Sequence, residues 1–377
     1  MSVARERAER YMRLALAQAG RGLGRTSPNP AVGAVVVRRG RIVGRGYHAR
    51  AGGPHAEVVA LRQAGARARG AELYTTLEPC DHFGRTPPCS AAILEAGIRR
   101  VWVGSRDPNP LVNGRGVARL RRRGVPVEEG VLAEECNRLN APWFTFITRG
   151  RPHVTLKAAV TLDGRIATRG GDARWVSGEA ARAWAHRLRD RVDAVLVGAG
   201  TARADDPLLT TRLPGRRGRD PLRVVLDTGL RLPSRLRLFT QRSGALTLLA
   251  HASGRSRRLG PGVELVRCRP GPGGVDLRDL LRKLADRGVA HLLVEGGAAV
   301  HARFLAAGLA DEVAIVVAPK LLGGDGVPLL AGPGPARMAG ALRLDDVRVE
   351  RLGEDILVRG RVPRRGRARL AKTRHQG

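Results

Sequence analysis

Cysteine and aromatic residues are scarce in this chain. Its 377 residues include only Cys80, Cys89, Cys136 and Cys268, and aromatic side chains make up 3%. So few cysteines in so long a chain argue against a disulfide framework. No apolar run approaches the ~18 residues of a membrane span, and the first twenty residues alternate charged and apolar positions at helical spacing, unlike an export signal. We expect a cytoplasmic protein without a membrane segment, beginning with an amphipathic helix.

Lysine is also nearly absent, although the chain is strongly basic. The formal net charge is +33, and the only lysines are Lys157, Lys283, Lys320 and Lys372. Clustered basic side chains would indicate a nucleic-acid partner, but here arginine is scattered through the predicted helices and loops. This distribution favours a solvated arginine-rich surface. We therefore expect small-molecule partners, and no nucleic acid.

The length allows two domains, and the hydrophobic pattern contains two α/β series. The first series alternates short apolar runs, typical of strands, with helical patterns that end at glycine. Its predicted strands are 32–37, 71–78 and 99–104, and its predicted helices are 55–65, 89–97 and 115–123. Alternation of this kind indicates a layered α/β domain.

The second series begins after residues 131–152, which mix aromatic, turn and basic residues and form the best boundary. Its predicted strands are 153–160, 193–198, 221–227, 246–250, 291–295 and 311–318. We expect domains at 1–150 and 151–362, followed by a basic, disordered tail at 363–377 that lacks apolar periodicity.

Three side chains in the first domain have the chemistry of zinc ligands. His55 opens a predicted helix, Cys80 ends a predicted strand, and Cys89 opens another helix. One imidazole and two thiolates suit a catalytic zinc, which keeps its fourth position for water. Helix N-termini at His55 and Cys89 would favour the thiolates that the metal needs.

Glu57 follows the histidine by two residues and therefore lies on a different side of the helix. There it can exchange protons beside the metal without ligating it. His-x-Glu followed by Pro-Cys and a second cysteine is the signature of zinc deaminases. A structural zinc would want a fourth protein ligand, for which His82 can be considered, but we assign His82 to the wall of a substrate pocket. Cys136 and Cys268 are interpreted as packing residues.

Eight residues separate Cys80 from Cys89, whereas nucleic-acid and nucleoside deaminases usually have two. With the runs at 27–33 (SPNPAVG), 53–57 (GPHAE) and 107–110 (DPNP), this spacing resembles the bifunctional deaminase–reductase family of riboflavin biosynthesis. Asp81 stands where that family usually has serine.

The resemblance implies an N-terminal three-layer α/β domain of the cytidine-deaminase type. It would remove the ring 2-amino group of 2,5-diamino-6-ribosylamino-4(3H)-pyrimidinone 5′-phosphate, with Glu57 shuttling protons. Asn29 would contact the pyrimidine edge, because an amide both donates and accepts hydrogen bonds. A turn residue between two prolines is an equally good interpretation of Asn29.

The second domain has one feature that can be interpreted from the residues alone. A predicted strand ends at Glu295, and Gly296 and Gly297 precede a helical run. A glycine pair at a helix N-terminus can bind an anion, although a plain tight turn is the commoner outcome.

The family resemblance continues to about residue 362, through 157–165, Trp175, 200–210 and 318–324. It implies a C-terminal α/β domain similar in fold to dihydrofolate reductase, which uses NADPH to reduce the ribosyl chain of 5-amino-6-(5-phosphoribosylamino)uracil to ribityl. By position, the resemblance assigns to NADPH Ala159, Trp175, Thr201, Asp205, Thr228, Gly297, Ala298, Ala299, Val300, His301, Ala302 and Arg303. It assigns to the substrate Lys157, Ala173, Arg189, Leu209, Arg212 and Glu295.

Several of these assignments have a second interpretation. Arg189 and Arg212 could clamp a phosphate through paired hydrogen bonds, or could be ordinary surface charge. Thr161 and Thr228 stand where the family often has serine, and Ala173 where it often has a hydroxyl contact.

Two other functions stay open for the whole chain. It could be a nucleic-acid-acting deaminase with a basic accessory domain, or its second domain could be a module that senses NADPH or a flavin precursor. We expect a homo-oligomeric enzyme with zinc and NADPH as cofactors, acting on pyrimidine ribosyl phosphates.

Overall fold

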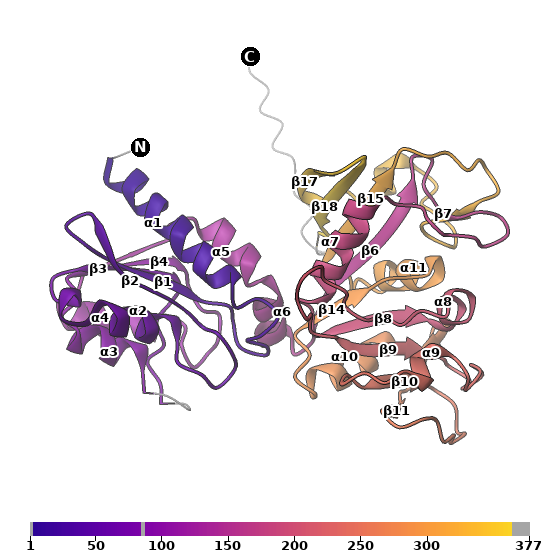
Figure 1. The fold of residues 1–377 in the computed structure, drawn as a ribbon, viewed down its shortest axis with the longest axis horizontal. Coiled ribbons are helices and arrows are strands. Elements are labelled where there is room, and N and C mark those ends of the chain that lie inside the picture. Colours follow the sequence, from indigo (N-terminus) through magenta and orange to yellow (C-terminus); the bar gives the residue numbers. More distant parts are fainter. Residues whose placement is uncertain (1–2, 84–86, 364–377) are drawn as a thin grey trace, which may run out of the picture. The chain divides into compact units, whose positions relative to one another are not determined.

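The computed structural model describes residues 3–83 and 87–363, which fold into two compact units (Figure 1). The first unit consists mainly of Met1–Pro152, and the second mainly of the chain from His153 onward. The predicted tail lies outside the described residues except for Pro363. Within the described ranges, no helix is long and apolar enough to cross a membrane.

The first unit is a five-stranded sheet with helices. Its strands are β1 (Gly33–Arg38), β2 (Arg41–Tyr47), β3 (Glu72–Leu77), β4 (Arg100–Ser105) and β5 (Val127–Glu129). Its helices are α1 (Val3–Gly20), α2 (Ala56–Ala64), the short 3-10 helix η1 (Gly65–Ala68), α3 (Cys89–Glu95), α4 (Arg115–Arg122), α5 (Ala133–Leu139) and α6 (Ala141–Arg149). The strand order is β2-β1-β3-β4-β5, with β3, β4 and β5 parallel and β1 antiparallel to its two neighbours.

Both faces of this sheet are buried, which makes the unit three layers deep. Successive strand residues point to opposite faces: Leu73 packs in a cluster with residues of α2, α3 and α4, whereas Tyr74 packs with residues of α1 and α5. Figure 1 shows these helix sets on opposite sides of the sheet. The continuous apolar run of β1, whose residues 33–37 are all buried, follows from burial on two faces, and the predicted layered domain is confirmed.

Two segments of the first unit differ from the sequence expectation. β2 was not predicted, because Gly44 and Gly46 interrupt its apolar pattern; a Cβ on Gly44 would lie 2.1 Å from the Ala60 carbonyl oxygen, so glycine lets α2 pack directly on the strand. Residues 131–152, expected as a boundary, instead contain helices α5 and α6. Pro142 lies in the first turn of α6, where a missing N–H costs nothing.

The second unit contains a nine-stranded sheet. Its order is β11-β10-β9-β8-β14-β6-β15-β18-β17. The strands are β6 (His153–Thr161), β8 (Ala194–Gly198), β9 (Leu222–Leu226), β10 (Thr247–His251), β11 (Val263–Arg267), β14 (His291–Val294), β15 (Glu312–Ala318), β17 (Asp345–Leu352) and β18 (Asp355–Arg361). Small two-stranded pairs are formed by β7 (Arg165–Ala167) with β16 (Val327–Pro328), and by β12 (Pro270–Gly271) with β13 (Gly274–Val275).

The helices of this unit are α7 (Glu179–Arg189), α8 (Ala199–Asp205), α9 (Arg237–Thr240), α10 (Leu277–Ala285), α11 (Ala298–Ala306) and the 3-10 helix η2 (Met338–Gly340). From β11 to β15 all neighbouring strands are parallel, whereas β18 and β17 add an antiparallel edge. The six strands predicted in this half correspond to β6, β8, β9, β10, β14 and β15, each shifted by at most one or two residues. The edge strands β11 and β17, and β18 next to β17, were missed, because their sequences are rich in arginine and acidic residues.

Candidate active site

The three predicted zinc ligands meet at one point of the first unit. His55 caps the N-terminus of α2, Cys80 follows the end of β3, and Cys89 is the first residue of α3. The His55 Nδ1 atom lies 3.1 Å from Cys89 Sγ and 3.5 Å from Cys80 Sγ, and the three ligand atoms lie within 4.8 Å of one another. A nitrogen and two sulfurs converging in this way fit a zinc ion.

The electrostatics of the two thiols also suit a cation. A hydrogen bond from Cys89 lowers the pKa of the Cys80 thiol to about 4, and His55 acts in the same direction. The same bond and burial raise the pKa of Cys89. The hydrogen bond to Cys80 raises the pKa of His55. Cys80 is therefore the thiolate of the pair, and a bound divalent cation would deprotonate Cys89 as well.

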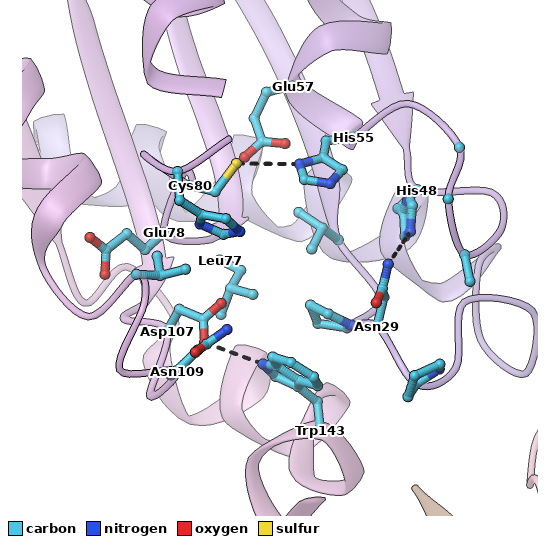
Figure 2. A pocket seen from close by; sticks show the side chains of 18 residues that line it. Asn29, His48, His55, Glu57, Leu77, Glu78, Cys80, Asp107, Asn109 and Trp143 are labelled. Carbon is cyan, nitrogen blue, oxygen red and sulfur yellow. Dashed lines mark hydrogen bonds between the residues drawn. The ribbon is translucent and has the colours of Figure 1, made fainter. Parts of the chain in front are cut away.

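Glu57 lies beside these ligands and is itself buried. It belongs to the first turn of α2, and Figure 2 shows its carboxylate close to Cys80 and His55. Burial raises the pKa of Glu57 to about 7, against the lowering effect of His55. A carboxyl group with a pKa near neutrality can both accept and return a proton at physiological pH.

A cavity of about 380 Å³ opens in front of this cluster. Its lining includes His55, Glu57 and Cys80 together with Asn29 and His82, the two side chains of this unit that the sequence assigned to a substrate. The Nδ1 atom of His82 is buried and has no hydrogen-bond partner among the described residues. An orphaned donor or acceptor inside a cavity is a natural contact for a bound ligand.

The cavity also contains polar residues that the sequence interpretation did not assign. They include His48, Asp107, Asn109 and Trp143. His48 Nδ1 lies 3.0 Å from the Pro54 carbonyl oxygen and must donate to it, which leaves Nε2 to accept from the Asn29 amide at 3.4 Å. Asp107 accepts hydrogen bonds from the Asn109 N–H and from Trp143 Nε1, and burial raises its pKa.

A sequence signal existed for only some of these residues. Asp107 and Asn109 directly follow β4, which is parallel to β3, so the ends of the two strands meet beside Cys80. That rule for parallel strands could have found them. Trp143 lies on α6, far along the chain, and only the tertiary structure brings it into the cavity.

In the second unit, three of the predicted substrate residues form one charged group. Arg189 Nε donates to Glu295 Oε1 at 2.8 Å and Arg189 Nη2 to Glu295 Oε2 at 2.5 Å, while Nη1 donates to the Thr210 carbonyl oxygen. Burial would raise the pKa of Glu295, but Arg189 lowers it to about 2. Lys157 is partly buried beside this pair, and the burial lowers its pKa.

This pairing changes the expected role of one arginine. The Arg189 guanidinium already directs three of its donors to Glu295 and Thr210, so it is a poor candidate for a phosphate clamp. Arg212 has one side-chain bond, from Nη1 to Thr210 Oγ1 at 3.2 Å, and is exposed. Of the two predicted clamps, Arg212 is the better placed to meet a phosphate.

The predicted glycine-rich anion site lies where two helices begin side by side. The parallel strands β8 and β14 are neighbours, Gly198 and Gly297 cap α8 and α11, and the Gly198 N–H donates to the Gly296 carbonyl oxygen. A Cβ on Gly297 would lie 3.0 Å from Thr201 Oγ1. Adjacent helix N-termini at the carboxyl ends of parallel strands form a cradle that fits a phosphorylated dinucleotide.

The other predicted cofactor residues of α11 divide into two groups. Val300 and His301 are buried, and His301 Nε2 lies 3.3 Å from the Val294 carbonyl oxygen, so these side chains face the interior. Ala298, Ala299 and Ala302 are less buried. A Cβ built on Gly274 would lie 2.4 Å from Thr228 Oγ1 and 3.6 Å from Arg303 Nη1, so these two side chains flank the same glycine.

The remaining predicted residues are spread over several elements. Trp175 is exposed beneath the Arg182 guanidinium, and its carbonyl oxygen accepts a bond from Lys320. The others are Ala159 on β6, Ala173 in the loop before α7, Asp205 at the end of α8, and Leu209, which is buried with a positive φ of 53°.

Comparison with known proteins agrees with this division into two sites. Residues 5–105 match the cytidine and deoxycytidylate deaminase zinc-binding region, and residues 152–358 match the RibD C-terminal domain. Fold and site together define a zinc-dependent deaminase joined to a reductase domain similar in fold to dihydrofolate reductase. The cofactors of this class are zinc and NADPH.

Relatives match the chain almost from end to end. The riboflavin biosynthesis protein RibD of Aquifex aeolicus (strain VF5) is 43% identical over 94% of this chain and 98% of its own length, and that of Escherichia coli (strain K12) is 39% identical over 92% and 97%. The crystal structure of the diaminohydroxyphosphoribosylaminopyrimidine deaminase/5-amino-6-(5-phosphoribosylamino)uracil reductase of Thermotoga maritima has a TM-score of 0.86 and 40% identity, covering 96% of this chain and 100% of that one.

The chain belongs to the RibD family of riboflavin biosynthesis proteins. It is a bifunctional enzyme, a hydrolase in its deaminase domain and an oxidoreductase in its reductase domain. The family, fold class, paired activities and cofactors predicted from the sequence are thereby confirmed.

Proposed function

We propose that this enzyme deaminates 2,5-diamino-6-ribosylamino-4(3H)-pyrimidinone 5′-phosphate and then reduces the ribosyl chain of the resulting 5-amino-6-(5-phosphoribosylamino)uracil. The observation that carries the proposal is the convergence of His55, Cys80 and Cys89 beside a buried Glu57 at the wall of one cavity. The substrates follow from the Thermotoga maritima relative, whose name specifies them.

In the deamination, the residues of this chain would bind the ring and move protons. A zinc ion held by His55, Cys80 and Cys89 would supply Lewis-acid activation of the hydrolytic water. Glu57 would accept a proton from that water and return it to the departing amine, a task suited to its raised pKa. Asn29 and His82 would hold the flat ring through the amide and the unpartnered Nδ1 atom.

In the reduction, the residues would chiefly orient the two reactants. The cradle formed by Gly297 and Thr201 would hold the NADPH phosphates, and Lys157 would lie near the ribose, held by Glu295. Arg212 would meet the substrate phosphate, while Arg189 would keep Glu295 in place. The domains would be 1–150 and 151–362.

The test supplies the diaminopyrimidine phosphate with and without NADPH, and follows ammonia release and NADPH oxidation separately. We expect ammonia in both samples, and NADPH oxidation only after deamination. NADPH oxidation with no ammonia release would contradict the proposed order.

Metal analysis tests the ligand set in the same protein. We expect about one zinc per chain, lost in Cys80→Ala and Cys89→Ala, because each change removes one of three protein ligands. Cys136→Ala is the matched control, since Cys136 is buried in the same unit but stands outside the ligand cluster. A metal-free protein with full deaminase activity would contradict the assignment.

We propose further that the enzyme is a homo-oligomer in the cytoplasm, with a second copy covering the edge strand β17. Seven of the eight residues of β17 are exposed, on both of its faces, and Val347 and Val349 are exposed by 53% and 65%. Arg348 and Glu350 share one face, so a two-fold antiparallel pairing centred on Val349 would set Arg348 opposite the partner's Glu350.

Light scattering of the purified protein tests this assembly. We expect an oligomer that Val349→Lys weakens, because the change places a cation at the two-fold centre. Val3→Lys is the control, as Val3 is another highly exposed valine. A wild-type monomer at micromolar concentration would contradict the proposal.

A further inference from the structure

The proposed zinc ligand Cys80 lies in a short segment, residues 78–81. Side chains on both sides of the cysteine hydrogen-bond to helix α4. Before it, the buried Glu78 carboxylate accepts hydrogen bonds from the Gly114 N–H at 2.9 Å and the Val117 N–H at 3.3 Å. These are unpaired donors at the N-terminal end of α4, where an anion is also favoured by the helix dipole. Glu78 therefore fixes the start of the helix against the end of β3.

The helix and the segment also approach each other closely between these bonds. A Cβ on Gly116 would lie 1.8 Å from the Pro79 carbonyl oxygen. Only glycine leaves room there, so the backbone that carries Cys80 lies directly on the first turn of α4.

After the cysteine, Asp81 makes the second attachment to α4. Its Oδ1 atom accepts a bond from Arg119 Nη1 at 2.8 Å and another from the hydroxyl of Ser90. Ser90 directly follows the ligand Cys89, and its backbone N–H donates to the Cys80 carbonyl oxygen at 3.1 Å. Asp81 directly follows Cys80. Its carboxylate therefore connects the chain next to both cysteine ligands, through itself and Ser90, to Arg119.

The ion pair with Arg119 requires a carboxylate at position 81. A serine at position 81 could bond to Ser90 but could not neutralise Arg119. The Asp81 and Arg119 side chains are only 15% and 34% exposed, so the ion pair is less screened than an open surface pair.

We propose that Asp81 and Arg119 are positioning residues that hold Cys80 and Cys89 at zinc-binding separation. The inference rests on the proposed zinc site. Residues that orient metal ligands typically change metal affinity by roughly 10- to 100-fold when replaced, and partial exposure places this pair at the lower end of that range.

The experiment measures zinc release from the full-length holoenzyme into excess chelator, for wild type, Arg119→Met, Asp81→Asn and the double variant. We expect each single variant to release zinc roughly tenfold faster, and the double variant to be no faster than the singles, because the two residues act through one contact. Arg119→Lys keeps the charge and should restore part of the difference.

Arg121→Met is the matched control. Arg121 lies on the same helix and pairs with Glu129 and the Val127 carbonyl oxygen, away from residues 78–81. The melting temperature of each zinc-free protein is measured in parallel, because a purely structural effect would lower it in proportion to the change in zinc release.

Three outcomes would overturn the inference. Zinc release from Arg119→Met at the wild-type or Arg121→Met rate would overturn it while leaving the zinc site intact, as would faster release that only follows the zinc-free melting temperature. A wild-type protein that holds no zinc would overturn both this inference and the proposed deaminase site.

Discussion

At the scale of single residues, Glu57 illustrates how environment sets a role. The chain has several buried glutamates, and Glu72 and Glu78 are as buried as Glu57. Glu72 accepts hydrogen bonds from Tyr74, Trp102 and Arg99, and Glu78 from backbone N–H groups of α4. Glu57 instead faces His55 and the two thiols. It is the buried carboxyl group best placed to move protons.

Replacing Glu57 by glutamine should separate proton transfer from metal binding. Glutamine has nearly the same shape but cannot take up a proton, so we expect ammonia release to fall by about 10²- to 10⁴-fold. Zinc content and NADPH oxidation with the deaminated intermediate should stay at wild-type levels. Surviving ammonia release in Glu57→Gln would show that another group carries the proton.

At the scale of elements, α4 depends on a glycine in its first turn. Replacing a helical glycine by alanine usually stabilises a helix by up to ~1 kcal/mol. Gly116→Ala should do the opposite and destabilise by about 1–3 kcal/mol, because the new methyl group would meet the Pro79 carbonyl oxygen at 1.8 Å. Denaturant unfolding measures the difference.

Gly200→Ala provides the matched control. Gly200 is likewise the second residue of its helix, α8, but a Cβ there would meet no atom within 4 Å. We expect this variant to be neutral or slightly stabilised. Equal stability of the Gly116 and Gly200 variants would show that α4 can move away from Pro79 without cost.

The adjacent starts of β6, β14 and β15 bring titratable groups together. The rings of His153 and His291 are 5.5 Å apart, and His291 Nε2 lies 2.9 Å from Thr155 Oγ1. Burial, and then His153, lower the pKa of His291 to about 3 against the opposing effect of Glu312. Burial would raise the pKa of Glu312, but His153 and Arg359 lower it to about 2.

Both shifts make the second unit less stable in acid. The folded pKa of His291 lies below its ordinary value of 6.5, so its neutral form adds full stability above pH 6.5 and loses it as the pH falls toward 3. Glu312 contributes in the same direction, but only below its ordinary pKa of 4.5. The interval from pH 6.5 to 4.5 therefore separates the effect of His291 from that of Glu312.

His291→Gln should flatten the loss of stability in that interval. Glutamine can still hydrogen-bond to Thr155 but does not titrate. Hydrogen exchange of β6 and β14, followed by mass spectrometry from pH 7 to 4.5, measures the local opening of these strands. An unchanged pH slope in the variant would contradict the assigned pKa of His291.

At the scale of the whole molecule, the charge of +33 is the most conspicuous property. Many of its arginines are engaged locally: Arg99 with Glu72, Arg106 with Glu129 and Arg216 with Asp190. Local pairing of this kind agrees with an arginine-rich surface more than with a continuous nucleic-acid groove.

We therefore expect RNA binding to be weak and non-specific. Affinity should fall steeply between about 0.05 and 0.2 M salt, as counterion release requires, and tRNA should release no ammonia. A salt-titrated binding assay combined with an ammonia assay on tRNA makes the measurement. Deamination of tRNA at physiological salt would support a nucleic-acid-acting deaminase instead.

Local sequence patterns were sufficient to predict the chemistry of this protein. The zinc ligands, Glu57 and the eight-residue spacing between the cysteines could be recognised because the residues concerned lie at or near the ends of predicted elements. Those elements have strong local signals, such as the glycine at position 65 that ends α2. The inner strands β6, β8, β9, β10, β14 and β15 of the second sheet could be predicted because burial on two faces makes them largely apolar.

Which distant side chains share a site became visible only in the folded chain. Trp143 lies in the cavity on helix α6, in a segment that the sequence pattern had indicated as a boundary, and Arg189 pairs with Glu295, a contact that the sequence did not predict. Asp81, noticed in the sequence as a departure, has its partner Arg119 one helix away. These contacts join residues from separate elements, and local sequence patterns carry no information about pairs that only long-range packing brings together.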